Sequence, residues 1–368
     1  MSASLLEHEQ IAIRTGRRSG VPIIIAVHST VLGPAAGGCR MWRYRRWQDG
    51  LEDVLRLSAG MTAKFAAAGL ARGGGKTVVA LPEEMELGPG QRREVLLDVA
   101  DAIEALGGIY ATGPDVGTGP DDMALMGERT NHVFCKPTAL GGSGDSSPHT
   151  ADGTLAALQA VATGLDGTRS LRGLRLAVVG LGNVGARIAA ALAQEGAELV
   201  LSDIDPGKQA LAEQLGARWE APEAALTAEV DIVVPAALGG VLTDVTVPAL
   251  RCRAIAGPAN NQLATPEVAD LLQARGIEWV PDYVASAGGV IHAVSVELDG
   301  LGEDDAHKRV LGIEGTVRDL LADAKRRGVS AAVAAEELVR ARLGAAARLG
   351  GAARFDAAAQ LGGAAPSA

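Results

Sequence analysis

The spacing of apolar positions becomes regular in the second half of the chain. From about residue 171, short apolar runs alternate with amphipathic helical patterns such as 184–195 and 266–275. The runs typical of buried strands are 174–179, 198–202, 230–235, 253–257 and 277–280. Strands and helices in alternation predict a doubly wound α/β fold with a parallel sheet.

The first half has a less regular pattern of the same kinds of element. Residues 21–27 and 77–81 are apolar runs typical of strands, and 51–68 and 91–106 have helical periodicity. This half therefore predicts a mixed α/β domain. The segment from about residue 344 onward is low in complexity and predicts a frayed helix or a disordered tail.

Composition narrows the classes of function. The chain has 368 residues, 48% of them hydrophobic, and a formal net charge of -10, which argues against a nucleic-acid partner. Its three cysteines show no paired spacing, so we expect free thiols, no disulfide framework and no metal site. The N-terminus does not resemble a secretory signal, and no apolar run reaches the roughly 18 residues that a membrane span needs. We expect a cytoplasmic protein with no membrane partner.

The segment GLARGGGKT, residues 69–77, looks like a phosphate-binding loop but has the wrong spacing. A P-loop has four residues between its first glycine and Gly-Lys-Ser/Thr, and that first position here is Leu70. The expected element order, helix and then strand, is also the reverse of a P-loop. We interpret the glycines as a turn that leaves room for a substrate beside Lys76.

A dinucleotide-binding turn is the strongest single motif. Gly180, Gly182 and Gly185 form GxGxxG directly after an apolar strand and before a helix. This pattern suits a tight turn, close approach of a pyrophosphate, and close packing of helix on strand. The other residues of the turn expected to contact the cofactor are Asn183 and Val184.

The acid that ends the next strand predicts the cofactor. Asp203 lies about twenty residues past the turn, where a carboxylate accepts both ribose hydroxyls and repels a 2′-phosphate. Ile204 follows in place of an arginine that could accept that phosphate, so we expect NAD rather than NADP. Asp205 is expected to cap the helix that follows Pro206.

Three charged residues in the first half of the chain are candidates for catalytic or substrate-binding roles. Lys64 follows Met61 by three residues on one helical face, Lys76 follows the glycines, and Asp115 lies in the loop ATGPDVGTG. Each has an ordinary structural explanation, as a solvated lysine, a lysine beside a strand or a turn aspartate. Their combination carries more weight than any one of them.

These residues lie in seven segments that resemble, in order, the leucine, valine and phenylalanine dehydrogenases, relatives of glutamate dehydrogenase. The segments are HSTVLGPAAGGCR, GMTAKFAAAGL, RGGGKTVVALP, TGPDVGT, GGSGDSS, GPANNQLA and PDYVASAGGVI. The resemblance implies NAD-dependent oxidative deamination of an L-amino acid to a 2-oxo acid and ammonia. It also implies a homo-oligomer.

The resemblance assigns roles to individual residues. Lys64 would bind the substrate carboxylate, Lys76 would act as acid and base with its pKa lowered by a second lysine, and Asp115 would exchange protons with the amine. The other substrate-binding positions would be Gly38, Met61, Gly113, Asn260 and Ala293. The nicotinamide would be lined by Thr150, Ala237 and Ser286.

The resemblance also implies a division of the chain. We expect a substrate domain at 1–140, a Rossmann domain at 141–290, a helical segment at 291–345 that returns to the first domain, and a flexible tail at 346–368. The hinge would lie around 134–152 and 284–300.

Several positions depart from the family pattern. Ser286 stands where the family has Asn, and His149, beside Thr150, is unusual and expected to be a surface or hinge residue. Ala36, Gly113 and Ala293 are smaller than the residues usual in the aliphatic enzymes, which favours an aromatic substrate such as phenylalanine. The alternatives are a valine or leucine dehydrogenase, if Met61 or a neighbour refills the pocket, and a catalytically silent NAD-binding protein. Glutamate as substrate would need a cation in the pocket, where these positions are apolar or small.

Overall fold

The computed structural model describes residues 7–349, which divide into two compact units. The N-terminal unit comprises residues 7–136 and 337–349 of this range, and the Rossmann unit comprises residues 137–336. The cut falls within four residues of the expected boundary at 140. No helix within residues 7–349 is long and apolar enough to cross a bilayer.

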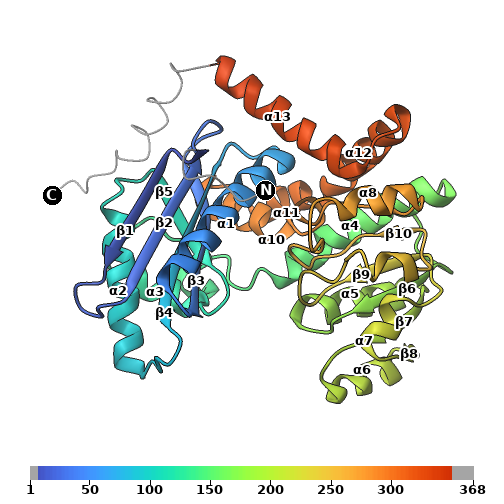
Figure 1. Cartoon of the computed structure of the whole chain (residues 1–368), viewed down its shortest axis with the longest axis horizontal. Coiled ribbons are helices and arrows are strands. Elements are labelled where there is room, and N and C mark those ends of the chain that lie inside the picture. The colour runs from blue at the N-terminus through green and yellow to red at the C-terminus, as the bar shows by residue number, and fades with distance from the viewer. Residues whose placement is uncertain (1–6, 350–368) are drawn as a thin grey trace. The chain divides into compact units, whose positions relative to one another are not determined.

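The N-terminal unit is built on a mixed five-stranded sheet in the order β1-β2-β4-β3-β5 (Figure 1). Its strands are β1 (Gln10–Thr15), β2 (Pro22–Ser29), β3 (Ala35–Tyr44), β4 (Gly73–Pro82) and β5 (Tyr110–Pro114). Strand β2 runs antiparallel to β1 and β4, whereas β3 runs parallel to β4 and β5. The parallel arrangement brings the C-terminal ends of β3, β4 and β5 to one edge of the sheet.

Helices cover both faces of this sheet because its strands are apolar on both sides. Helix α1 (Trp47–Ala68) packs Val54 and Leu55 against β2 and β4 on one face. Helices α2 (Pro89–Glu104) and α3 (Pro120–Met126) pack on the opposite face, around Tyr110. The two helical patterns predicted at 51–68 and 91–106 are therefore confirmed, with α1 beginning four residues earlier.

The end of α1 receives a side chain from far along the chain. Gly69 ends the helix in the left-handed conformation, with a φ of 69°. Arg342 of α13 (Ala331–Leu349) donates to the carbonyls of Ala66 and Ala67, at 2.6 and 2.7 Å. A cation suits the C-terminal end of a helix, because the last carbonyls lack intrahelical partners. This contact attaches the C-terminal half of α13 to the N-terminal unit.

The Rossmann unit confirms the doubly wound parallel sheet. Its six strands pair in the order β8-β7-β6-β9-β10-β11, all parallel. Counted from β6, this is the order 3-2-1-4-5-6 of dinucleotide-binding folds. The strands are β6 (Arg175–Val179), β7 (Glu198–Ser202), β8 (Arg218–Trp219), β9 (Ile232–Pro235), β10 (Ala254–Ile255) and β11 (Glu278–Trp279). The two-residue β8 was not predicted.

Helices of the Rossmann unit surround the sheet and continue beyond it. The helices beside the strands are α5 (Asn183–Glu195), α6 (Gln209–Gln214), α7 (Pro222–Leu226), α8 (Val268–Ala274) and α9 (Asp282–Ala285). A second group packs on or near the long helix α4 (Ser147–Asp166) and consists of α10 (Gly288–Ala293), α11 (Glu303–Leu311) and α12 (Ile313–Arg327).

The course of the C-terminal segment corrects the expected division. Residues 291–345 were expected to pack on the first domain, but residues 291–336 belong to the Rossmann unit, because α10, α11 and α12 pack on α4. Of the described residues, only 337–349 join the N-terminal unit. The expected tail at 346–368 is helical as far as residue 349, and the rest lies outside the described residues.

Candidate active site

A buried lysine and an aspartate form an ion pair on the α1 face of the N-terminal sheet. Lys76 lies in β4 and Asp115 directly follows β5, and Lys76 Nζ is 3.3 Å from Asp115 Oδ2. The lysine side chain is only 6% exposed and that of the aspartate 23%. Strand β3 lies between β4 and β5, so the pair spans the width of a strand.

Gly38 in β3 permits this contact. It pairs with Gly113 of β5, and an added Cβ at Gly38 would lie 2.8 Å from Asp115 Cβ and 3.0 Å from Lys76 Nζ. Such distances are below those of ordinary contacts, so any larger residue would separate the pair. The structure therefore brings together three of the residues that the sequence singled out.

Arg40 is a further member of this site that the sequence did not indicate. It lies two residues after Gly38, on the same face of β3. Its Nε donates to Asp115 Oδ2 at 2.9 Å, and its Nη1 donates to Asp53 Oδ2 at 2.8 Å. The alternation of side chains along a strand was the available signal, since residues 36, 38 and 40 share one face.

The charges around Asp115 keep its carboxylate ionised. Burial by itself favours the neutral acid, but the cations of Lys76 and Arg40 outweigh it and hold the pKa of Asp115 below its usual value. The sequence led us to expect a second lysine as the charged neighbour of Lys76. The structure shows an ion pair of Lys76 with this carboxylate, and the expected influence of a second lysine stays a prediction.

The glycines before Lys76 do not clear space for a substrate, and that interpretation was wrong. Gly73, Gly74 and Gly75 lie inside β4 rather than in a turn. A Cβ at Gly74 would lie 2.2 Å from the backbone nitrogen of Thr62 in α1, and one at Gly75 would lie 2.5 Å from the ring of Tyr110. The absent side chains let protein groups pack tightly on both faces of the strand.

Two further candidates lie on the helix that covers this face of the sheet. Met61 and Lys64 are both half-buried in α1. They are three residues apart and therefore neighbours on the helix surface. Their proposed roles, lining the substrate pocket and binding the substrate carboxylate, remain predictions.

The space beside Gly113 is occupied, contrary to the reasoning from sequence. A Cβ at this position would lie 2.6 Å from Cε2 of Phe134. Phe134 is buried, and its backbone nitrogen donates to Thr112 O at 3.0 Å beside β5. The aromatic ring thus fills the volume that the missing methyl group was expected to leave. Ala36 lies in β3 on the same face of the sheet as Gly113 and is fully buried.

The dinucleotide turn of the Rossmann unit has three glycines in three different environments. Gly180 has a φ of +108°, which disfavours other residues. Gly182 precedes α5, and a Cβ there would have no atom within 4 Å, which leaves open space at the helix N-terminus. A Cβ on Gly185 would lie 2.0 Å from Gly180 O, so only glycine allows the helix to pack this closely on the turn.

This geometry fits a bound pyrophosphate. The open space at Gly182 adjoins the unpaired N–H groups and positive dipole end of α5, whose first residues are Asn183 and Val184. Asp203 stands beside the turn, accepting from Leu181 N at 2.6 Å and from Asp205 N at 2.9 Å. Each carboxylate oxygen keeps acceptor capacity for a ribose hydroxyl. Asp205 accepts from Gly207 N at 2.9 Å, which confirms its predicted capping role.

The remaining candidates are also in the Rossmann unit. Ala237 lies next to Gly180, and Ser286 Oγ is 3.5 Å from Asn260 Oδ1. Thr150 is in the first turn of α4, where its Oγ1 donates to Ser146 O at 3.0 Å. Ala293 is buried at the end of α10. The candidate residues are thus divided between the two units.

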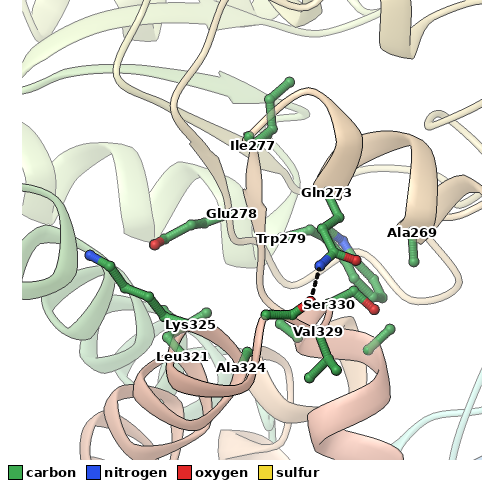
Figure 2. A pocket seen from close by; sticks show the side chains of 14 residues that line it. Ala269, Gln273, Ile277, Glu278, Trp279, Leu321, Ala324, Lys325, Val329 and Ser330 are labelled. Carbon is green, nitrogen blue, oxygen red and sulfur yellow. Dashed lines mark hydrogen bonds between the residues drawn. The ribbon is translucent and has the colours of Figure 1, made fainter.

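A pocket of about 280 Å³ lies elsewhere in the Rossmann unit (Figure 2). It is lined by residues of α8, β11 and α12 and by those that begin α13, with Glu278 and Lys325 as its charged groups. Gln273 Nε2 donates to Gly328 O at 3.1 Å beside it. None of the candidate cofactor or substrate residues lines this pocket, so it is separate from the dinucleotide turn.

A six-stranded sheet of dinucleotide-binding topology is typical of nucleotide-dependent dehydrogenases, and the ion pair of buried Lys76 with half-buried Asp115 adds a candidate catalytic pair. Two family models match the chain. Residues 8–132 match the dimerisation domain of Glu/Leu/Phe/Val dehydrogenases, and residues 204–299 match the glutamate/leucine/phenylalanine/valine dehydrogenase model. The chain belongs to this family and is an amino-acid dehydrogenase, an oxidoreductase acting on CH–NH₂ groups.

Individual relatives match nearly the whole chain. A leucine dehydrogenase of Bacillus subtilis is 40% identical over 338 residues, which cover 92% of both chains. A phenylalanine dehydrogenase of Caldalkalibacillus thermarum is 38% identical and covers 93% of both chains. The crystal structure of an L-tryptophan dehydrogenase from Nostoc punctiforme has a TM-score of 0.80 at 33% identity, covering 93% of this chain and 98% of its own. Relatives with aliphatic and with aromatic substrates thus have similar identity to this chain.

Proposed function

We propose that the protein catalyses the reversible, NAD-dependent oxidative deamination of an apolar L-amino acid. The substrate, water and NAD⁺ would give the 2-oxo acid, ammonia, NADH and a proton. The observation that carries this proposal is the ion pair of buried Lys76 with half-buried Asp115, which supplies a proton donor and a proton acceptor 3.3 Å apart. NAD⁺, when bound, accepts the hydride from the substrate Cα.

The residues of the N-terminal unit would divide the remaining work. Lys64 would bind the substrate carboxylate by a charge-assisted hydrogen bond. Asp115 would take a proton from the substrate ammonium group, and Lys76 would activate the water that attacks the imine carbon. Arg40 contacts Asp115 and Asp53 rather than the reacting atoms, so we assign it a positioning role.

NAD rather than NADP would be the cofactor. The Asp203 carboxylate adjoins the glycine turn through its bond to Leu181 N, where it would accept the ribose hydroxyls and repel a 2′-phosphate. Ile204 is 87% exposed and offers no positive charge to that phosphate.

Aromatic amino acids, phenylalanine among them, would be favoured over valine and leucine. This preference rests on the small side chains of Ala36, Gly113 and Ala293. Because Phe134 occupies the space beside Gly113, the enlargement would come chiefly from the two alanines. The alternative is a branched-chain substrate, and the leucine dehydrogenase relatives favour it.

A homo-oligomer is the expected assembly, because residues 8–132 match a model described as a dimerisation domain. Light scattering coupled to gel filtration would measure the mass of the assembly. A purely monomeric enzyme with full activity would contradict this part of the proposal.

The activity is tested by NADH absorbance at 340 nm with NAD⁺ and each of the twenty amino acids. Lys76→Ala should abolish deamination while leaving NADH binding, measured by fluorescence, nearly unchanged. A matched control is Lys308→Ala, which removes an exposed lysine that is 2.8 Å from Asp305. Turnover by Lys76→Ala at the wild-type rate would refute the assigned role. Absence of absorbance change with every amino acid would favour a catalytically silent NAD-binding protein.

A further inference from the structure

Two histidines and an aspartate gather on α4 and α11 of the Rossmann unit, apart from the residues assigned to catalysis. His149 and Asp152 are three residues apart in α4 and face the same side of the helix. His307 comes from α11, which packs on α4. One potential ligand atom from each of the three side chains lies within 4.8 Å of the other two.

The ring of His149 is held in place by a neighbouring histidine. It stacks on the ring of His292, with centroids 3.3 Å apart and an interplanar angle of 7°. His292 is buried, and its Nε2 is 2.6 Å from Glu303 Oε2, which fixes the orientation of that ring. The stacked pair therefore presents His149 to Asp152 and His307 in a defined orientation.

One ring nitrogen of His149 is buried and has no hydrogen-bond partner among the described residues. Within residues 7–349, His149 Nδ1 is one of few buried side-chain polar atoms with no hydrogen bond. Buried polar atoms in native proteins nearly always have a partner, so an unpaired atom needs an explanation. A ligand bound by this cluster of imidazoles and a carboxylate would supply that explanation.

We propose that His149, Asp152 and His307 bind a divalent transition-metal ion of the Zn²⁺ type. Two imidazoles and one carboxylate are ligands that suit Zn²⁺, Co²⁺ or Ni²⁺ better than Mg²⁺ or Ca²⁺, which take mostly oxygen ligands. Three protein ligands leave one coordination position for water.

The geometry needs only small side-chain movements to close around an ion. Ligand distances of about 2.0–2.2 Å place the donor atoms of a tetrahedral site about 3.3–3.6 Å apart. His307 Nδ1 and Asp152 Oδ2 are already 3.7 Å apart. Their side chains are 46% and 39% exposed, so a change of rotamer costs less for them than for His149, whose ring is stacked on His292.

A metal at this place would link α4 to α11 within one unit. Thr150, a candidate nicotinamide contact, directly follows His149 in the first turn of α4. Binding would therefore stabilise the N-terminal end of α4. This inference does not depend on the substrate or on the catalytic roles proposed above.

The test is calorimetric titration of untagged, EDTA-treated full-length protein with ZnCl₂ at pH 7.5. We expect one site per chain, at least tenfold weaker in His307→Gln and in Asp152→Asn. Thermal unfolding should show a melting temperature that rises with ZnCl₂ in the wild type and not in these variants. Co²⁺ should give visible absorption bands typical of a site with nitrogen and oxygen ligands.

The matched control is His132→Gln. It removes a partly exposed histidine of the N-terminal unit, whose Nε2 is 3.9 Å from a Glu104 oxygen. This variant should bind Zn²⁺ like the wild type. Both test variants change exposed side chains, so circular dichroism should show an unchanged fold. Equal Zn²⁺ affinity in the wild type and in His307→Gln would overturn the proposal, as would a loss in His132→Gln equal to that in His307→Gln.

Discussion

Gly38→Ala isolates the geometric requirement of the active site, because it adds one methyl group and removes no functional group. The new Cβ would lie 2.8 Å from Asp115 Cβ, 2.9 Å from Pro114 O and 3.0 Å from Lys76 Nζ. Ordinary contacts begin at 3.4 Å, so the aspartate must shift by about 0.6 Å, the difference between 3.4 and 2.8 Å. The ion pair with Lys76 would lengthen or break as a result.

The size of the effect follows from how steeply catalysis depends on position. A misplacement of about 1 Å costs roughly a hundredfold in rate, so a shift of about 0.6 Å should lower kcat by about 10- to 100-fold. This loss equals about 1.4–2.7 kcal/mol of transition-state stabilisation. Overpacking would also lower the free energy of unfolding by about 1–3 kcal/mol.

The assay is kcat and KM for the preferred amino acid at 340 nm, with NADH binding and thermal unfolding measured on the same samples. NADH affinity should stay near wild type, because the dinucleotide turn lies in the other unit. The matched control is Gly60→Ala, since a Cβ at this exposed position in α1 meets no atom within 4 Å. It should raise the stability by about 0.5–1 kcal/mol and leave kcat unchanged. A kcat within threefold of wild type in Gly38→Ala would refute the reasoning.

Three further predictions concern charge, cofactor and substrate. The folded-state pKa of Asp115 is lowered, so its ion pairs stabilise the protein above the unfolded pKa of about 4 and are lost as the pH falls below it. The melting temperature of Asp115→Asn should therefore lie below wild type at pH 6 and approach it by pH 3, and a constant difference would contradict this. Asp203→Ser should narrow the preference for NAD over NADP, measured as the ratio of kcat/KM values; a native enzyme using both cofactors equally would exclude the assigned role. Gly113→Ala should displace the Phe134 ring, which lies 2.6 Å from the position of the new Cβ, and lower the ratio of kcat/KM for phenylalanine to that for valine. A native ratio below one would exclude the aromatic preference.

Local features of the chain were predictable because neighbours in sequence encode them. The strand, glycine turn and helix at 175–195 follow from apolar runs and from glycines at fixed spacing. The capping role of Asp205 could likewise be predicted from the sequence. Its short side chain reaches only the backbone of residues close to it in the chain, here the nitrogen of Gly207. The parallel sheet of the Rossmann unit followed from the alternation of these local patterns.

Errors arose where a local pattern was used to infer what lies across the sheet. The glycines at 73–75 suggested an open turn, yet Thr62 and Tyr110 fill the space beside them. The missing side chain at Gly113 suggested a larger pocket, yet Phe134 packs there. In both places the chain shows an absent side chain but not the distant group that occupies its volume.

The sequence by itself determined which chemical groups are available and the local shape of the cofactor turn. The tertiary structure alone decided that Lys76 contacts Asp115, that Arg40 supports the aspartate, and that Arg342 caps α1. The physical reason is pairing register, because β4, β3 and β5 bring residues 38, 76 and 113 side by side only once the parallel strands have aligned. The same holds for the histidine cluster, whose members share a site because α11 packs on α4.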